Sequence, residues 1–177
     1  MTNFVVTPTD DDMYTAIGNA IMAWLGLDAA HIVQEFNNEV AMPVGPFVGM
    51  RFGTRKRLRT NKTIWDRTNP APTAVTKEQG VQIACQLDCY APNSGDWASI
   101  LTTLFRDPVG VAALDPICAP LYCDDGRRAP LTDSEEQYED RWIVMLYLQY
   151  NPVLSTPQDF ADTLAPTLTN VDVRYPP

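Results

Sequence analysis

The side chains that could support chemistry in this sequence are few and scattered. His31 is the only histidine, and it stands directly before a short apolar segment. A catalytic histidine needs a nucleophile or an orienting carboxylate within hydrogen-bond reach, and no sequence motif supplies one here. We interpret His31 as a surface or capping residue, and sites that require two histidines are excluded.

The four cysteines, Cys85, Cys89, Cys118 and Cys123, raise the question of a zinc site. Structural zinc ligands usually come in pairs held on a turn. Cys85 and Cys89 fall in a segment with the alternation of a β-strand, where their Cα atoms would lie roughly 13 Å apart. Cys118 and Cys123 would approach each other only across a turn. We therefore expect free thiols, no metal and no cofactor.

Acidic residues cluster at 10–12, 124–125 and 133–140. The first cluster suits the positive N-terminus of a helix, the second a turn, and the third a solvated corner before a strand. None has the spacing of a calcium-binding loop. The sequence also lacks a phosphate-binding glycine loop, a nucleophile elbow and a dinucleotide fingerprint. We expect no enzymatic activity.

Charge is distributed unevenly along the chain, whose net charge is −9. Seven of the 13 basic residues lie in the segment 51–67, and the remainder of the chain carries six basic residues against 21 acidic ones. The seven are Arg51, Arg55, Lys56, Arg57, Arg59, Lys62 and Arg67. An acidic body should repel nucleic acid. We therefore favour docking of the basic segment on a neighbouring copy over a solvated hairpin that protects a sheet edge and over contact with DNA.

The length of 177 residues suits one domain. No apolar run approaches the roughly 20 residues that span a bilayer, and the N-terminal residues do not form a secretion signal. We expect a soluble single domain over 1–177 that folds in a cytoplasm. Its core extends over about 9–152, its basic arm over about 51–67, and its proline-rich tail over about 153–177.

Two amphipathic helices are expected. The first begins after Thr9, a candidate N-cap, and ends at Gly26. The second begins near Ser94 and ends at Pro108. Apolar residues recur at helical spacing in both, namely Met13, Ile17, Ile21 and Trp24 in the first and Trp97, Ile100, Leu101, Leu104 and Phe105 in the second.

Several segments have the character of strands. Apolar residues recur at every second position over 81–90, and residues 137–150 are largely apolar on both faces and so should lie mid-sheet. Residues 115–122 contain two prolines, which allows only an edge strand. Strands on either side of the basic segment would form a long hairpin arm. These elements predict an α+β fold, with a mainly antiparallel sheet, two helices packed on one face and a long β-hairpin arm.

Three stretches follow one another in a recognisable order. They are PVGPFVGM (43–50), residues 82–101 with LDCY running into SGDWA (87–98), and PLY (120–122) followed by EQYEDRW (136–142). Together they resemble the neck or tail terminator proteins of tailed bacteriophages, over about 9–152. The resemblance implies an α/β subunit of a homomeric ring, typically sixfold, which closes the tail tube and joins it to the head around a DNA channel. The unusually charged arm and the proline-rich tail depart from that pattern.

The resemblance implies structural roles for the matching residues. Trp97 would seat the second helix on the sheet, and Arg141 and Asp88 would form a pair within or between subunits. Trp24 and Trp142 are further structural candidates.

The resemblance also implies the partners. They are further copies of the chain, the tail tube or sheath and the head–tail connector, with DNA passing through without sequence-specific binding and no membrane. The protein would lie in the neck of the virion after assembly in the host cytoplasm. The alternatives are another tail protein, such as a tube or baseplate component, and a small enzyme built around His31 or the cysteines.

Overall fold

The structure is a computed structural model, and it describes residues 4–35, 43–65, 74–129, 131–132 and 138–157. Its helices are α1 (Asp10–Leu25), α2 (Ser94–Phe105) and α3 (Pro108–Leu114), with a 3-10 turn η1 (Ala29–His31). Its strands are β1 (Val6–Thr7), β2 (Ile32–Gln34), β3 (Phe47–Arg57), β4 (Lys62–Ile64), β5 (Ala74–Glu78), β6 (Val81–Tyr90), β7 (Ala119–Cys123), β8 (Arg127–Arg128), β9 (Leu131–Thr132), β10 (Tyr138–Glu139), β11 (Arg141–Tyr150) and β12 (Val153–Pro157). None of the described helices is long and apolar enough to cross a bilayer.

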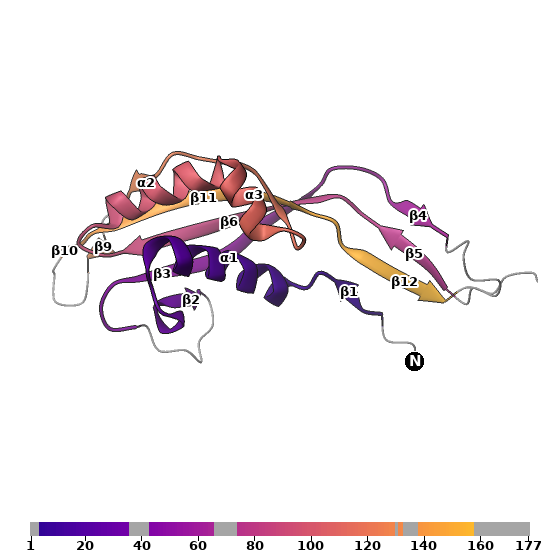
Figure 1. Cartoon of the computed structure of the whole chain (residues 1–177), viewed down its shortest axis with the longest axis horizontal. Helices are drawn as coiled ribbons and strands as arrows, with labels where there is room; N and C mark the ends of the chain where they lie inside the picture. Colours follow the sequence, from indigo (N-terminus) through magenta and orange to yellow (C-terminus); the bar gives the residue numbers. More distant parts are fainter. Residues whose placement is uncertain (1–3, 36–42, 66–73, 130, 133–137, 158–177) are drawn as a thin grey trace, which may run out of the picture.

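A six-stranded sheet forms the body of the molecule (Figure 1). Its strand order is β2-β3-β6-β11-β7, and β8 also pairs with β11. Strands β6 and β11 pair antiparallel along their whole length, and among the described strands only β2 and β3 run parallel. The mid-sheet position predicted for β11 and the edge position predicted for β7 are both confirmed.

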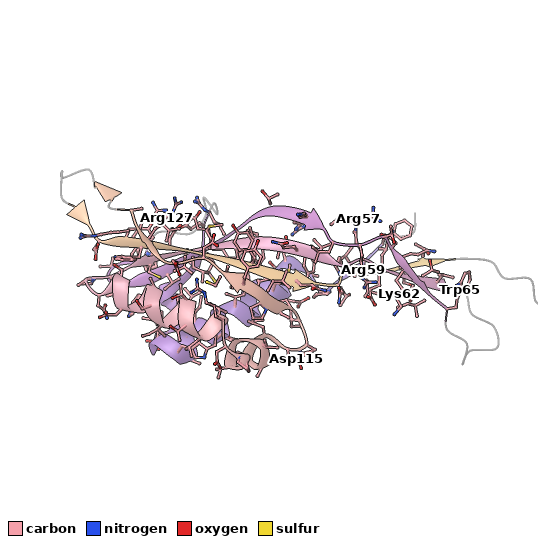
Figure 2. The ribbon with its side chains drawn as sticks, turned by 90° about the horizontal axis from the view of Figure 1, so that it is seen from above. Arg57, Arg59, Lys62, Trp65, Asp115 and Arg127 are labelled. Carbon is pink, nitrogen blue, oxygen red and sulfur yellow. The ribbon has the colours of Figure 1, made fainter. Side chains whose placement is uncertain are left out.

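The core lies between this sheet and the helices, which Figure 2 shows along one side of it. Because side chains alternate along a strand, β6 directs one set of apolar residues into the core. These are Val81, Ile83, Cys85, Leu87 and Cys89, and all are buried. The predicted α+β class with a mainly antiparallel sheet is confirmed, although the structure has three helices where two were expected.

Helix α1 begins and ends where its sequence predicts. The Thr9 hydroxyl accepts a hydrogen bond from the Asp12 backbone N–H, and the Asp12 carboxylate accepts one from the Thr9 N–H, which completes a capping box. Gly26 closes the helix with φ 67°, a left-handed conformation that glycine adopts without steric cost. Between these caps, Met13, Ile17 and Ile21 are fully buried.

Helix α3 was not expected, because Pro108 was interpreted only as the end of α2. Helix α2 ends at Phe105, and Pro108 instead opens α3. Proline suits the first helical position, where a missing N–H removes no hydrogen bond. The Asp107 carboxylate caps the new helix by accepting a hydrogen bond from the Val109 N–H at 3.0 Å.

The start of α2 also differs by one residue from the prediction. Asn93 is its N-cap, and Ser94 is the first helical residue. The buried Ser94 hydroxyl bonds to Asp140 instead of capping the helix.

Four short strands form a second sheet, the extension, with the order β1-β12-β5-β4. It projects from the body along the long axis of the molecule (Figure 1). Strand β5 leads into β6 across Gln79 and Gly80, and β11 leads into β12 across Asn151 and Pro152. The Gln79 N–H donates a hydrogen bond to the Pro152 carbonyl at 3.1 Å. The extension therefore continues the two central strands of the body.

The expectation of a hairpin arm over 51–67 is wrong, because the two strands do not pair with each other. Strand β3 pairs with β6 as far as Arg57, whereas β4 pairs with β5. The two strands flanking the basic segment therefore belong to different sheets, because each has a partner farther along the chain. The sequence interpretation missed β5, whose Lys77 and Glu78 obscure an apolar pattern, and placed β12 in the tail. Arg67 and residues 158–177 of the expected tail lie outside the described residues.

The contact of α3 with α2 yields a test of stability. A Cβ at Gly110 would lie 2.5 Å from the Leu104 carbonyl oxygen and 3.0 Å from Phe105 Cα. We expect Gly110→Ala to lower the free energy of unfolding by about 1–3 kcal/mol, because backbone must move. Gly18→Ala in α1 is the matched control, since its Cβ would meet only ordinary contacts at 3.5 Å and beyond. Urea denaturation measures both, and equal stabilities would contradict the packing of α3.

Candidate functional site

Among the described residues, the side chains that could support chemistry do not form a metal-binding group. Within the described ranges, no three His, Cys, Asp or Glu side chains are grouped as a metal site requires. The four cysteines are free and buried, and desolvation raises the pKa of Cys89 to about 12 and of Cys118 to about 11. A neutral buried thiol is a poor nucleophile. His31 is the last residue of η1.

A polar network crosses three strands on the sheet face opposite the helices and reaches the residue after β2. Asp88 of β6 is fully buried, and its Oδ2 lies 3.0 Å from Arg141 Nη2 of β11. Gln86 Nε2 donates to both Asp88 carboxylate oxygens at 2.9 Å, and Arg51 of β3 donates to Gln86 Oε1. Arg51 Nε also lies 3.8 Å from Glu35 Oε2, just beyond β2. Of the two arrangements considered for Asp88 and Arg141, the structure therefore has the pair within one chain.

The surroundings of this network hold it in place. The Arg141 guanidinium lies over the Tyr90 ring, 5.4 Å from its centroid. The Phe47 ring stacks on the same Tyr90 ring, with centroids 4.4 Å apart. Gly49 leaves room for Glu35, because a Cβ there would sit 2.3 Å from Glu35 Oε1. Removing one partner of a buried ion pair lowers the free energy of unfolding by several kcal/mol, since the other charge remains buried without a partner. The network thus ties β2 and β3 to the centre of the sheet.

Glu35 has an unusual protonation equilibrium. Desolvation is the main cause that raises its pKa from 4.5 to about 7, and the negative charge of Asp88 and a hydrogen bond to Asp88 act in the same direction. Arg51 and Arg141 oppose that rise. Near neutral pH a protonated Glu35 can donate to the Asp88 carboxylate, so the two acids coexist with less repulsion.

The tryptophans expected to be structural lie in or beside the core. Trp97 is buried within it, and Trp24 meets Phe105 edge to face with centroids 4.9 Å apart. Trp142 is partly buried and packs against the core, close to Gly95 and Gly126.

The structure distributes the basic segment over several contacts. Arg51 belongs to the buried network, Arg55 pairs with Asp10 of α1, and Arg59 pairs with Glu78 of β5. These three charges are therefore compensated within the chain, which sequence alone did not indicate.

Three basic residues of the segment 51–67 have no ion pair among the described residues. Over the described ranges, Lys56, Arg57 and Lys62 have no carboxylate within ion-pair distance. Arg57 is oriented by hydrogen bonds to the Arg59 carbonyl and to Asn61. Figure 2 shows Lys62 and Trp65 on the extension and Arg57 at the end of β3, where the body meets the extension, all of them away from Arg127. Leu58 and Ile64 are exposed beside them. We call Lys56, Arg57, Leu58, Lys62 and Ile64 the basic patch.

The pKa of Glu35 gives a stability prediction with a definite sign. Because the folded pKa exceeds the unfolded value, the free energy of unfolding should fall as pH rises from about 4.5 to about 7. We expect Glu35→Gln to remove this decline, and to be about 1–2 kcal/mol more stable than the parent at pH 8 but similar at pH 5. Urea denaturation at both pH values measures the difference. Glu78→Gln, which removes an acid that pairs with Arg59, is the control and should not be more stable than the parent at pH 8. If the stability difference between Glu35→Gln and the parent were the same at both pH values, the raised pKa of Glu35 would be refuted.

Comparison with known proteins shows the family of the chain. A search of curated protein sequences found no match. A family model described as phage neck terminator protein matches residues 11–172, which include the strands of the body, those of the extension except β1, and the segment after Pro152 as far as residue 172. A structural protein of the phage neck is a virion component and interacts with other virion proteins. The chain therefore belongs to the family of phage neck terminator proteins.

Proposed function

We propose that this protein is the subunit of a closed homomeric ring, typically sixfold, that terminates the tail tube and joins it to the head. The observation that carries this proposal is the basic patch, which lies on the extension and on the adjoining end of β3, in a chain that is otherwise acidic. A ring needs two different complementary surfaces on each subunit. One chain here supplies both a projecting positive surface and a negative body.

The charge balance also suits a channel for DNA. Outside 51–67 the chain carries six basic residues against 21 acidic ones. Binding of a protein to DNA depends on neutralising phosphates with Lys and Arg. A ring of predominantly acidic bodies would let DNA pass without retaining it, while the tail tube or sheath and the head–tail connector contact its two ends.

Removal of the gene tests the place of the protein in the virion. We expect particles grown without it to show filled heads and overlong or unjoined tails in electron micrographs, because a tail that is not terminated is neither limited in length nor joined. Supplying the protein from a plasmid should restore joined particles. Complete absence of tails would instead favour the alternative of a tube or baseplate component and would overturn the proposal.

Reversal of the basic patch tests its part in ring closure. The variant Lys56→Glu, Arg57→Glu, Lys62→Glu changes exposed side chains, so we expect a folded protein with unchanged circular dichroism. Assembly should weaken by about tenfold or more, since like charges would then face each other. Sedimentation velocity or mass photometry over a range of concentrations measures the oligomer.

The matched control for this reversal lies at the opposite end of the molecule. Arg127→Glu with Arg128→Glu alters two exposed basic residues there, at the cost of one exposed ion pair between Arg128 and Asp140. Such a pair contributes at most about 1 kcal/mol. We expect this control to assemble like the parent, and normal assembly of the patch reversal would show that the patch does not close the ring.

A further inference from the structure

We propose that the basic patch of one copy docks on a specific surface of the next copy, the exposed side of α3. This inference rests on the ring proposed above and names the surface that receives the extension. A shallow depression of about 570 Å³ marks the place. It is lined by Arg106, Asp107, Pro108, Val111, Ala112 and Asp115, which we call the α3 shelf.

The α3 shelf combines two carboxylates with exposed aliphatic surface. Val111, and Val109 next to it, are 47% and 48% exposed, which is high for valine on a helix that packs against a core. Asp107 and Asp115 lie at the two ends of α3 and are exposed. Across the described part of the chain, neither has a cation within ion-pair distance. Adjacent apolar and charged groups of this kind are typical of an interface.

The one basic residue of the shelf does not cancel this charge. Arg106 donates to the Cys123 carbonyl oxygen and pairs with Asp125 at 2.7 Å. Its guanidinium is therefore committed to the loop after β7, and the shelf remains negative at both ends of α3.

The basic patch has the complementary composition. It brings Arg57 and Lys62, which lack a described carboxylate partner, together with exposed Leu58 and Ile64. Two basic patches would repel each other, and so would two shelves, so the surfaces favour a head-to-tail contact over a twofold one. Figure 2 shows Asp115 on the helix side of the body, Lys62 on the extension and Arg57 at the adjoining end of β3. One chain can therefore use both surfaces at once, as a closed ring requires.

Two other acidic groups of the body are less suitable receptors, because each is already paired. Asp10 pairs with Arg55, and Asp125 pairs with Arg106.

The shelf is also held in a fixed position, which lowers the entropic cost of docking. Gly110 packs directly on the α2 backbone, and hydrogen bonds from Asp115 N–H to Val111 O and from Ile117 N–H to Leu114 O fix the end of α3. Docking therefore needs no rearrangement of α3.

A charge exchange between the two surfaces tests this docking. The shelf variant carries Ala112→Lys and Asp115→Lys, and the patch variant carries Arg57→Glu and Lys62→Glu. We expect each alone to associate about tenfold more weakly than the parent or worse, by sedimentation velocity. An equimolar mixture should assemble again, because the acidic patch of one variant meets the basic shelf of the other around an alternating ring. Asp96→Lys with Ser99→Lys on α2 makes the same change of charge away from the shelf and should assemble like the parent.

The outcomes separate this inference from the proposed function. If the patch variant fails to assemble while the shelf variant assembles like the parent, the extension docks on some other surface and the ring stands. If both variants fail alone and their mixture also fails, charge pairing between these two surfaces is refuted. Circular dichroism of each variant excludes misfolding as the cause. A parent protein that stays monomeric both alone and with isolated tail tubes would overturn the ring itself, and with it the docking.

Discussion

Strand β6 imposes the constraint on which the rest of the molecule depends. It pairs with β3 on one side and β11 on the other, so both of its edges are used. Its core-facing residues demand helices over one face. The other face contains Asp88, which is fully buried and therefore requires Arg141 and Gln86 beside it. The neighbouring strands are held in register both by apolar packing and by this one carboxylate.

The same strand explains why the extension is part of the fold and not a loose arm. Strand β5 enters β6 through Gln79 and Gly80, and β11 leaves the body toward β12, so backbone hydrogen bonding continues from one sheet toward the other. A surface presented at the end of such strands keeps a defined direction relative to the body. Recognition between subunits depends on that kind of preorganisation, because the ordering of a flexible segment would oppose binding.

Internal ion pairing decides which charges can act between molecules. Arg51, Arg55 and Arg59 are compensated within the chain, and only part of the basic segment remains for a partner. Fewer carboxylates remain for a partner as well, since Asp10 and Asp125 form ion pairs within the chain. The four cysteines contribute apolar volume to the core.

The sequence by itself determined the elements whose signals are local. The capping box and Gly26 of α1, the alternation of β6 and the apolar character of β11 each depend on neighbouring residues, and the division into an acidic body and a basic segment is a matter of composition. Only the tertiary structure decided the pairing of β3 with β6 and of β4 with β5, the existence of α3, and the partners of each arginine. Those features depend on contacts between residues far apart in the chain, where several pairings satisfy the local pattern and burial selects one of them.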